Sequence, residues 1–252
     1  DAAIKWVEKT ANKTGDIKLA DFNDPSSILT TWKRKVAPRS PNQHYYIKSL
    51  MQTELAVGVG PAGTGKTYLA VAVAVAMLKN RQVERLILSR PAVEAGERLG
   101  FLPGDLKDKV DPYLRPLYDA LHDMMPEDHV ERLIENGEIE IAPLAFMRGR
   151  TLANSYVILD EAQNTTPAQM KMFLTRMGEN SHVCITGDLS QIDLPIGAKS
   201  GLSDALEILS TIPDVSITEF FSSDVVRHPM VTKIVNAYDQ REGKQLYKVP
   251  AQ

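Results

Sequence analysis

The 252-residue chain lacks several features that mark particular classes of protein. Its one cysteine, Cys184, cannot form an internal disulfide and lies in an apolar run that favours a small buried thiol. We find no signal peptide and no apolar run of membrane-spanning length. A formal net charge of −3 excludes a uniformly basic nucleic-acid coat but leaves room for a local basic patch. These absences predict a soluble protein in a reducing, cytoplasmic setting.

Aromatic residues are also scarce, at 6% of the chain, so no segment plainly predicts base stacking. No internal repeat is visible. Hydrophobic residues make up 43% and charged residues 24%, which suits a full core in one or two domains. The first residue is Asp1 rather than Met, which is compatible with an excised fragment.

The most informative segment of the chain is a phosphate-binding loop. Residues 60–67 match the pattern G-x-x-x-x-G-K-[ST] at every fixed position. Glycines let successive backbone N–H groups surround phosphate oxygens, while Lys66 is expected on the β- and γ-phosphates and the Thr67 hydroxyl on Mg²⁺. The predicted nucleotide contacts here are Gly60, Pro61, Ala62, Gly63, Thr64, Gly65, Lys66, Thr67 and Tyr68.

The residues that flank the loop support this interpretation. An apolar run of strand length, residues 54–59, precedes it, and residues 68–78 form a helical segment that is apolar on nearly all faces. A chance glycine-rich turn is the alternative, and composition allows such a match in about one sequence in a hundred. With both flanking elements in place, the chain is predicted to bind a nucleoside triphosphate.

The rest of the chain predicts one α/β domain. Residues 1–38 are mostly polar and indicate an N-terminal arm or linker, with the P-loop domain over residues 39–252. Apolar runs alternate with helical patterns, which favours a mostly parallel sheet with helices on both faces, of RecA-like type. Thr166 to Gln169 forms a capping box, and Gly178 is expected to close that helix. The predicted strands are 53–59, 85–90, 138–142, 155–160, 182–187 and 214–219.

Two acids follow the predicted strand 155–160. Carboxyl ends of parallel strands gather at the ligand-binding edge of a sheet, so Asp160 is expected to hold Mg²⁺ and Glu161 to activate the attacking water. By itself such a pair is more often a solvated turn. After a phosphate loop it favours an ATPase over a small-molecule kinase, whose nucleophile is the substrate.

A third polar segment follows the strand 182–187. Gln191 or Asp188 is expected to sense the γ-phosphate, and a solvated loop after an edge strand is the alternative.

Several of these strings resemble known motifs. Residues 160–163 and 187–191 resemble the second and third motifs of superfamily 1 helicases, and Asn42-Gln43 resembles the glutamine motif that reads adenine. Longer strings over roughly residues 39–240 are similar to PhoH and PhoH-like proteins. They lie at residues 89–97, 99–105, 111–116, 142–151 and 224–229.

The resemblance implies a cytoplasmic, RNA-associated ATPase with one RecA-like domain, linked to RNA metabolism and phosphate starvation. It suggests a hexameric ring and a helicase-like motor after assembly. PhoH-like members often carry an N-terminal domain of RNA-binding type, and a related branch carries a PIN ribonuclease domain. Neither is evident in residues 1–38. An ATP-dependent scaffold for a partner ribonuclease, with slow turnover, is the alternative function.

Four arginines are candidates for further roles. Arg227, in one of the family-like strings, is predicted to reach the γ-phosphate from the same domain or from a neighbouring protomer, with packing or salt bridging as an equal alternative. Arg90, Arg148 and Arg150 suit RNA phosphates, and a solvated or interprotomer role is equally compatible.

Overall fold

The computed structural model describes residues 27–91 and 106–226, with residues 230, 231, 234 and 241 beyond them. For residues 106–112 it describes the backbone alone. Most of the predicted N-terminal arm, the family-like string 99–105 and Arg227 lie outside the described residues.

A six-stranded sheet forms the centre of the fold, in the order β5-β4-β6-β7-β3-β8. Every pairing within it is parallel, so the predicted strand type is confirmed. The six predicted strands all form, with ends within two residues of those expected. Their bounds are β3 Leu55–Val59, β4 Arg85–Arg90, β5 Ile139–Pro143, β6 Ser155–Leu159, β7 His182–Gly187 and β8 Val215–Glu219.

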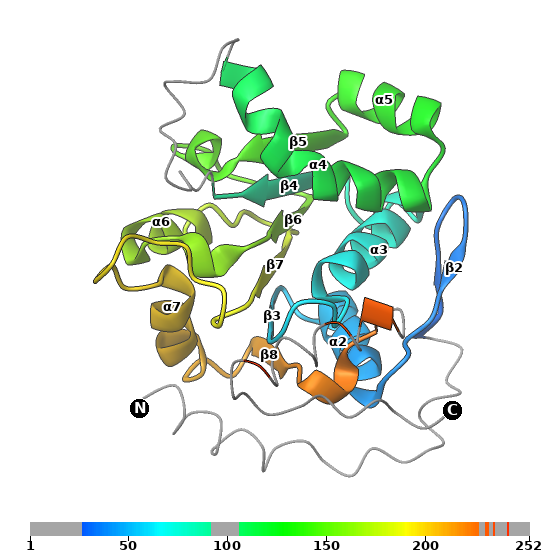
Figure 1. Ribbon diagram of the computed structural model, residues 1–252. Coiled ribbons are helices and arrows are strands. Elements are labelled where there is room, and N and C mark those ends of the chain that lie inside the picture. The colour runs from blue at the N-terminus through cyan, green and yellow to red at the C-terminus, as the bar shows by residue number, and fades with distance from the viewer. Residues whose placement is uncertain (1–26, 92–105, 227–229, 232–233, 235–240, 242–252) are drawn as a thin grey trace.

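Helices cover both faces of this sheet, as predicted (Figure 1). Side chains of a strand alternate between faces, and in β6 Tyr156 and Ile158 enter one core while Val157 and Leu159 enter the other. The first core packs on α2 Pro41–Gln52, α3 Lys66–Lys79, α4 Leu106–Met124 and α5 Glu127–Glu135. The second packs on α6 Pro167–Leu174 and α7 Gly201–Leu209, with the 3-10 helices η5 Leu144–Met147 and η6 Ala162–Asn164.

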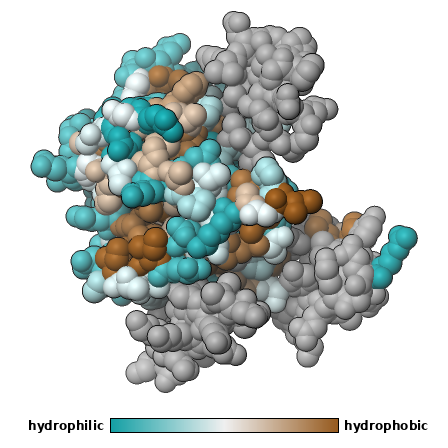
Figure 2. All heavy atoms as spheres, turned by 90° about the vertical axis from the view of Figure 1, so that its left-hand side faces the viewer, coloured by the Kyte–Doolittle hydropathy of each residue, from teal (hydrophilic) through white to brown (hydrophobic). Residues whose placement is uncertain are grey.

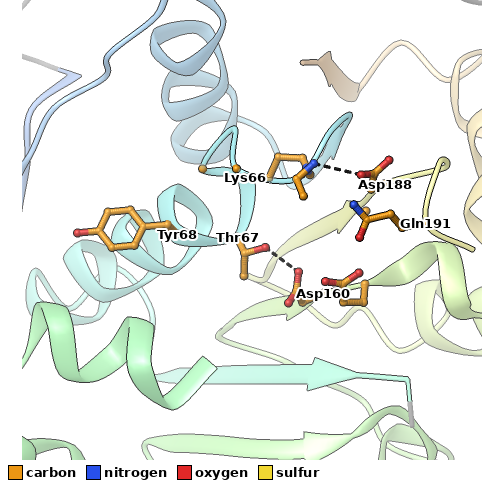
Figure 3. Close-up of a pocket in the computed structure, with 11 residues that line it drawn as sticks. Lys66, Thr67, Tyr68, Asp160, Asp188 and Gln191 are labelled. Carbon is orange, nitrogen blue, oxygen red and sulfur yellow. Dashed lines mark hydrogen bonds between the residues drawn. The ribbon is translucent and has the colours of Figure 1, made fainter. Parts of the chain in front are cut away.

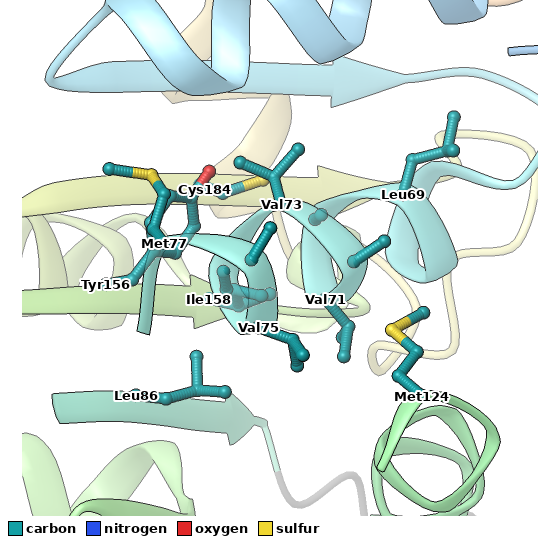
Figure 4. Close-up of a cluster of buried hydrophobic side chains, with 14 of the residues drawn as sticks. Leu69, Val71, Val73, Val75, Met77, Leu86, Met124, Tyr156, Ile158 and Cys184 are labelled. Carbon is teal, nitrogen blue, oxygen red and sulfur yellow. The ribbon is translucent and has the colours of Figure 1, made fainter. Parts of the chain in front are cut away.

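Helix α3, which begins at the phosphate loop, lies in the middle of the first core. Val71, Val73 and Val75 of α3 are fully buried, and so is Met124 of α4 (Figure 4). A helix without a polar face must be enclosed, because its apolar surface would otherwise face water on one side. None of the described helices combines the length and hydrophobicity of a membrane span.

The packed part of the chain begins earlier than the expected boundary near residue 39. Strands β1 Leu29–Thr30 and β2 Lys35–Val36 form an antiparallel hairpin. Leu29 and Val36 are buried in the first core, and β1 packs on α3. The hairpin is therefore part of the domain, and the assignment of residues 1–26 as an arm stays a prediction.

Helix α6 confirms its predicted start and corrects its predicted end. Both hydrogen bonds of the capping box between Thr166 and Gln169 are present. The helix ends at Leu174, so Gly178 does not close it. A Cβ on Gly178 would lie 2.8 Å from the backbone nitrogen of Ala153, so this glycine instead permits two backbone segments to approach closely.

Candidate nucleotide-binding site

The carboxyl ends of β3, β6 and β7 bring the predicted site together. Strand β4 follows β3 in the chain, but two strands, β6 and β7, lie between them in the sheet. The loops that follow these parallel strands therefore frame a crevice at their carboxyl ends. A cavity of about 250 Å³ lies there. Its lining residues are Ala62, Gly63, Gly65, Lys66, Thr67, Tyr68, Asp160, Glu161, Gly187, Asp188 and Gln191.

The phosphate loop has the backbone that its glycines predict. Gly60, Gly63 and Gly65 have φ values of 142°, 83° and 83°, which L side chains rarely adopt. Gly65 caps α3 with no side-chain hydrogen bond to the first turn. The first N–H groups of a long helix are therefore left for a ligand, and the helix dipole favours an anion there.

Lys66 is folded onto its own loop. Its Nζ donates to the carbonyl oxygens of Gly60 at 2.6 Å and Pro61 at 2.8 Å. Burial lowers the pKa of Lys66 below its ordinary value, and nearby carboxylates, of which Asp188 acts most strongly, oppose that shift. The loop thus holds a buried cation next to the place where phosphate charge is expected.

Asp160 is buried and accepts three side-chain hydrogen bonds. Its Oδ1 accepts from the hydroxyls of Thr67 and Thr186, both at 2.7 Å, and its Oδ2 accepts from Nε of Arg90 at 2.9 Å. Thr67 and Asp160 face each other in Figure 3. One carboxylate and one hydroxyl are hard oxygen donors of the kind that Mg²⁺ takes alongside phosphates and water, so the residues fit that ion.

Glu161 has a strained backbone and two hydrogen-bonded carboxylate oxygens. Its φ of 54° is in the left-handed region, where a residue with a Cβ costs about 1–2 kcal/mol. Oε1 accepts from Nη2 of Arg90 at 2.8 Å, and Oε2 accepts from Nε2 of Gln163. Strain of this kind is typical of sites where geometry matters for function.

Gln163 connects the two acidic segments and was not identified as a site residue from the sequence. Besides its bond to Glu161, its Nε2 donates to the carbonyl of Gln191 at 3.1 Å, and its Oε1 accepts from the amide of Asp188 at 3.0 Å. Asp188 in turn accepts from the amide of Ala62 at 3.1 Å, in the phosphate loop. The signal was available, because residue 163 ends the helicase-like string.

Gln43, in α2, contacts the phosphate loop. It is buried, its Nε2 donates to the carbonyl of Thr64 at 2.9 Å, and its Oε1 accepts from the amide of Arg39 at 2.7 Å. Each end of the amide can make one more hydrogen bond. The contact with Thr64 places Gln43, the residue predicted to read adenine, beside the phosphate loop.

Asp224 ties the start of α2 to the chain after β8, and sequence reasoning assigned it no role. It lies in η7 Ser222–Asp224 and is buried. Its carboxylate accepts from Oγ of Ser40 at 2.6 Å and from Nδ2 of Asn42 at 2.8 Å. Two residues later, the amide of Val226 donates to the carbonyl of Gly63 at 2.9 Å. The described chain thus returns to the phosphate loop just before Arg227, which itself lies outside the described residues.

The remaining predicted residues have varied surroundings. Tyr68 lines the cavity, but its ring points away from Asp160 and Asp188, and its hydroxyl donates to Asp123 at 2.7 Å (Figure 3). Gln191 lines the cavity from an exposed position.

The three arginines proposed for RNA or protomer contact differ from one another. Arg90 lies inside the site, where it donates to Asp160 and Glu161. Arg150 forms a two-bond pair with Glu140, each bond 2.6 Å long. Arg148 is exposed, and within the described ranges its side chain makes no hydrogen bond or ion pair. Arg148 is therefore the one of the three with an uncommitted guanidinium.

Comparisons with known proteins match most of the chain. The family model described as PhoH-like protein matches residues 35–239. A PhoH-like protein of Bacillus subtilis (strain 168) is 63% identical over 208 residues, which cover 82% of this chain and 65% of the relative. One of Mycobacterium bovis is 57% identical over 215 residues, 85% of this chain and 61% of the relative. The chain therefore spans less than two thirds of the length of these relatives.

Among solved structures, the SWI2/SNF2 ATPase core of Sulfolobus solfataricus in complex with dsDNA is similar in fold, at 15% identity and a TM-score of 0.43. The match covers 80% of this chain and 52% of that one.

Proposed function

The chain belongs to the PhoH-like protein family and has the fold of a P-loop NTPase; from the geometry of its site we propose that it hydrolyses ATP with Mg²⁺ and couples hydrolysis to RNA. The observation that supports hydrolysis most strongly is the meeting of Lys66, Thr67, Asp160 and Glu161 around one cavity. A site that only transferred phosphate to a small molecule would have no need of Glu161 beside the metal-binding acid.

Each group has a separate task in this proposal. Lys66 leaves its loop carbonyls for the β- and γ-phosphates, whose charge offsets the cost of its burial. Thr67 and Asp160 hold Mg²⁺, which when bound neutralises charge on the transferring phosphoryl group. Glu161 orients the attacking water and accepts its proton, and Gln191 responds to the γ-phosphate from the cavity wall.

Adenine is the base that Gln43 suits. With one N–H and one oxygen lone pair left, its amide can donate to one ring nitrogen and accept from an exocyclic amino group of the same base. A guanine presents a carbonyl where adenine presents that amino group, so the pair of bonds favours ATP over GTP.

RNA is the proposed partner on the strength of the family resemblance, together with the cation of Arg148, whose side chain has no partner among the described residues. A guanidinium without a protein partner is suited to a phosphate oxygen, whereas Arg150 would first have to leave Glu140. A role in phosphate starvation rests on the resemblance alone.

The experiment measures ATP turnover with and without single-stranded RNA. Lys66→Ala should abolish turnover and weaken binding, and turnover within a few-fold of the parent would contradict the assignment. Glu161→Gln should keep ATP and Mg²⁺ bound while hydrolysis slows strongly, whereas Asp160→Asn should weaken metal-dependent binding. Identical binding behaviour of the two variants would show that their roles are not separate.

The response to RNA separates the motor from the scaffold. Slow turnover that does not change with RNA, together with nucleotide-dependent capture of a ribonuclease, would support the scaffold instead.

Self-association is proposed as a ring in which Arg227 supplies a cation to the γ-phosphate. The family resemblance favours a donor in the neighbouring protomer, while the contact of Val226 with Gly63 favours one in the same molecule. Arg227→Ala should lower turnover at least tenfold with ATP affinity little changed, since such arginines contribute about 10³–10⁵ in rate.

Mixing separates the two routes for Arg227. Lys66→Ala protomers keep Arg227, so co-assembly with Arg227→Ala protomers should partly restore turnover if the arginine acts across a boundary. No recovery in verified mixed assemblies would assign it to its own protomer, and full turnover of Arg227→Ala alone would remove it from the site.

A further inference from the structure

We propose that Arg90 is a positioning residue for hydrolysis, which holds the Glu161 carboxylate in place for the attacking water through a clamp anchored on α4. This inference rests on the proposed function. It replaces the expectation, drawn from the sequence, that Arg90 contacts RNA or another protomer.

The guanidinium of Arg90 is engaged on all three of its nitrogens. Nε donates to Oδ2 of Asp160 at 2.9 Å, Nη2 to Oε1 of Glu161 at 2.8 Å, and Nη1 to the carbonyl of Tyr113 at 2.8 Å. Only 16% of its side chain is exposed, so little of it is available to a macromolecule. A planar group bound on three sides has one orientation, which lysine could not reproduce.

Glu161 needs such a restraint more than Asp160 does. The side chain of Asp160 is 5% exposed and is held by Thr67 and Thr186 even without the arginine. The side chain of Glu161 is 40% exposed and its backbone is strained. The structure gives its carboxylate Arg90 and Gln163 as side-chain donors, one on each oxygen. Without Arg90, Glu161 would keep one restraint, while Asp160 would keep two.

The charges around the two acids lead to the same conclusion. Asp160 and Glu161 are adjacent carboxylates that repel each other, and Arg90 lies between them with a bond to each. Each carboxylate oxygen can accept two hydrogen bonds, so a clamped Glu161 still has lone pairs for a water and for its proton. The arginine therefore fixes the base without occupying the position where it acts.

The anchor on Tyr113 explains why the clamp stays in place. Tyr113 belongs to α4, which packs on α3 and on β4. Arg90 is the last residue of β4, whose neighbour in the sheet, β6, leads directly to Asp160. The clamp thus joins α4 to two adjacent strands at the edge of the sheet where the nucleotide is expected.

The test compares Arg90→Gln and Arg90→Lys with a matched control at the other end of the same strand. Arg85→Gln removes the arginine at the start of β4. The Nη2 of Arg85 donates a hydrogen bond of 3.4 Å to the carbonyl of Ala153. At saturating ATP and Mg²⁺, Arg90→Gln should lower kcat by about 10²-fold, a loss of the size that a misplacement of about 1 Å can cause. KM and ATP affinity should stay within a few-fold. Arg90→Lys should recover part of kcat, and Arg85→Gln should match the parent.

A double variant shows whether Arg90 acts through Glu161. In a Glu161→Gln background, Arg90→Gln should change kcat by less than threefold, because the group that it positions is already gone. The inference would be overturned if the kcat losses of Arg90→Gln and Glu161→Gln multiplied in the double variant, or if Arg85→Gln lost as much kcat as Arg90→Gln. It would also be overturned if Arg90→Gln alone left kcat unchanged or raised it. Urea unfolding of every variant verifies that it folds. If Arg90→Gln does not fold, the kcat of Arg90→Lys is the test: a value below that of the parent supports the inference, and an unchanged value overturns it.

Failure of this inference is distinguishable from failure of the proposed function. If Lys66→Ala and Glu161→Gln both turn over ATP like the parent, the function is wrong. If they lose turnover as expected while Arg90→Gln retains it, only the role of Arg90 is wrong.

Discussion

Gly60 tests how tightly the phosphate loop is joined to the strand beside it. A Cβ at this position would lie 2.3 Å from the carbonyl oxygen of Phe220 and 2.9 Å from its carbonyl carbon, both backbone atoms that cannot rotate away. The φ of 142° adds strain for any L side chain, about 1–3 kcal/mol. Displacing the packed backbone costs about another 1–3 kcal/mol. Gly60→Ala should therefore lower the free energy of unfolding by about 2–6 kcal/mol.

Gly137 provides the matched control. Its φ of 74° is also positive, but an added Cβ would meet no atom within 4 Å. Gly137→Ala should cost only the backbone term, about 1–2 kcal/mol. The entropy that alanine removes from the unfolded chain is common to both variants and cancels in the comparison.

Urea denaturation of the two variants beside the parent measures the difference, provided that the unfolding is two-state with equal m values. Gly60→Ala should also weaken nucleotide binding, since the clash with Phe220 would shift the backbone where the phosphate loop begins. Equal losses of stability in Gly60→Ala and Gly137→Ala would refute the packing argument, because only the first variant has a contact to break.

Four further outcomes are expected. Burial raises the pKa of Cys184 from its ordinary 9.0 to about 12, so the thiol should resist iodoacetamide at pH 8 until urea unfolds the chain. Because the unfolded thiol ionises first, the stability that Cys184 contributes should be complete below pH 9 and lost between pH 9 and 12, as urea curves across that range would show. Thr166→Ala removes one bond of the capping box with Gln169 and should lower the free energy of unfolding by about 1 kcal/mol. Arg150→Gln breaks a part-exposed pair with Glu140 and should change it by no more than about 1 kcal/mol.

The sequence by itself was sufficient for the parallel sheet and for the central residues of the candidate site. The spacing of apolar residues along the chain predicts the strands and the buried helix after the loop, and the spacing of Thr166 and Gln169 predicts the capping box. Such local patterns can be recognised in a single sequence. The same holds for Lys66, Thr67, Asp160 and Glu161, because the ends of parallel strands must meet at one edge of the sheet.

Only the tertiary structure decided how these groups are held. Arg90 was expected on the surface, yet the pairing of β4 with β6 sets it against both acids, 70 and 71 residues further along the chain. Gly178 had the position of a helix stop, but its role depends on the backbone of Ala153.

Asp224 bonds to Ser40 across a separation of 184 residues, and no local pattern encodes such a distance. Composition and periodicity report which face of an element is buried, but not which element lies opposite. Long-range partners are chosen when strands pair and helices pack on them, and in this protein that step assembles the hydrogen bonds around an otherwise predictable site.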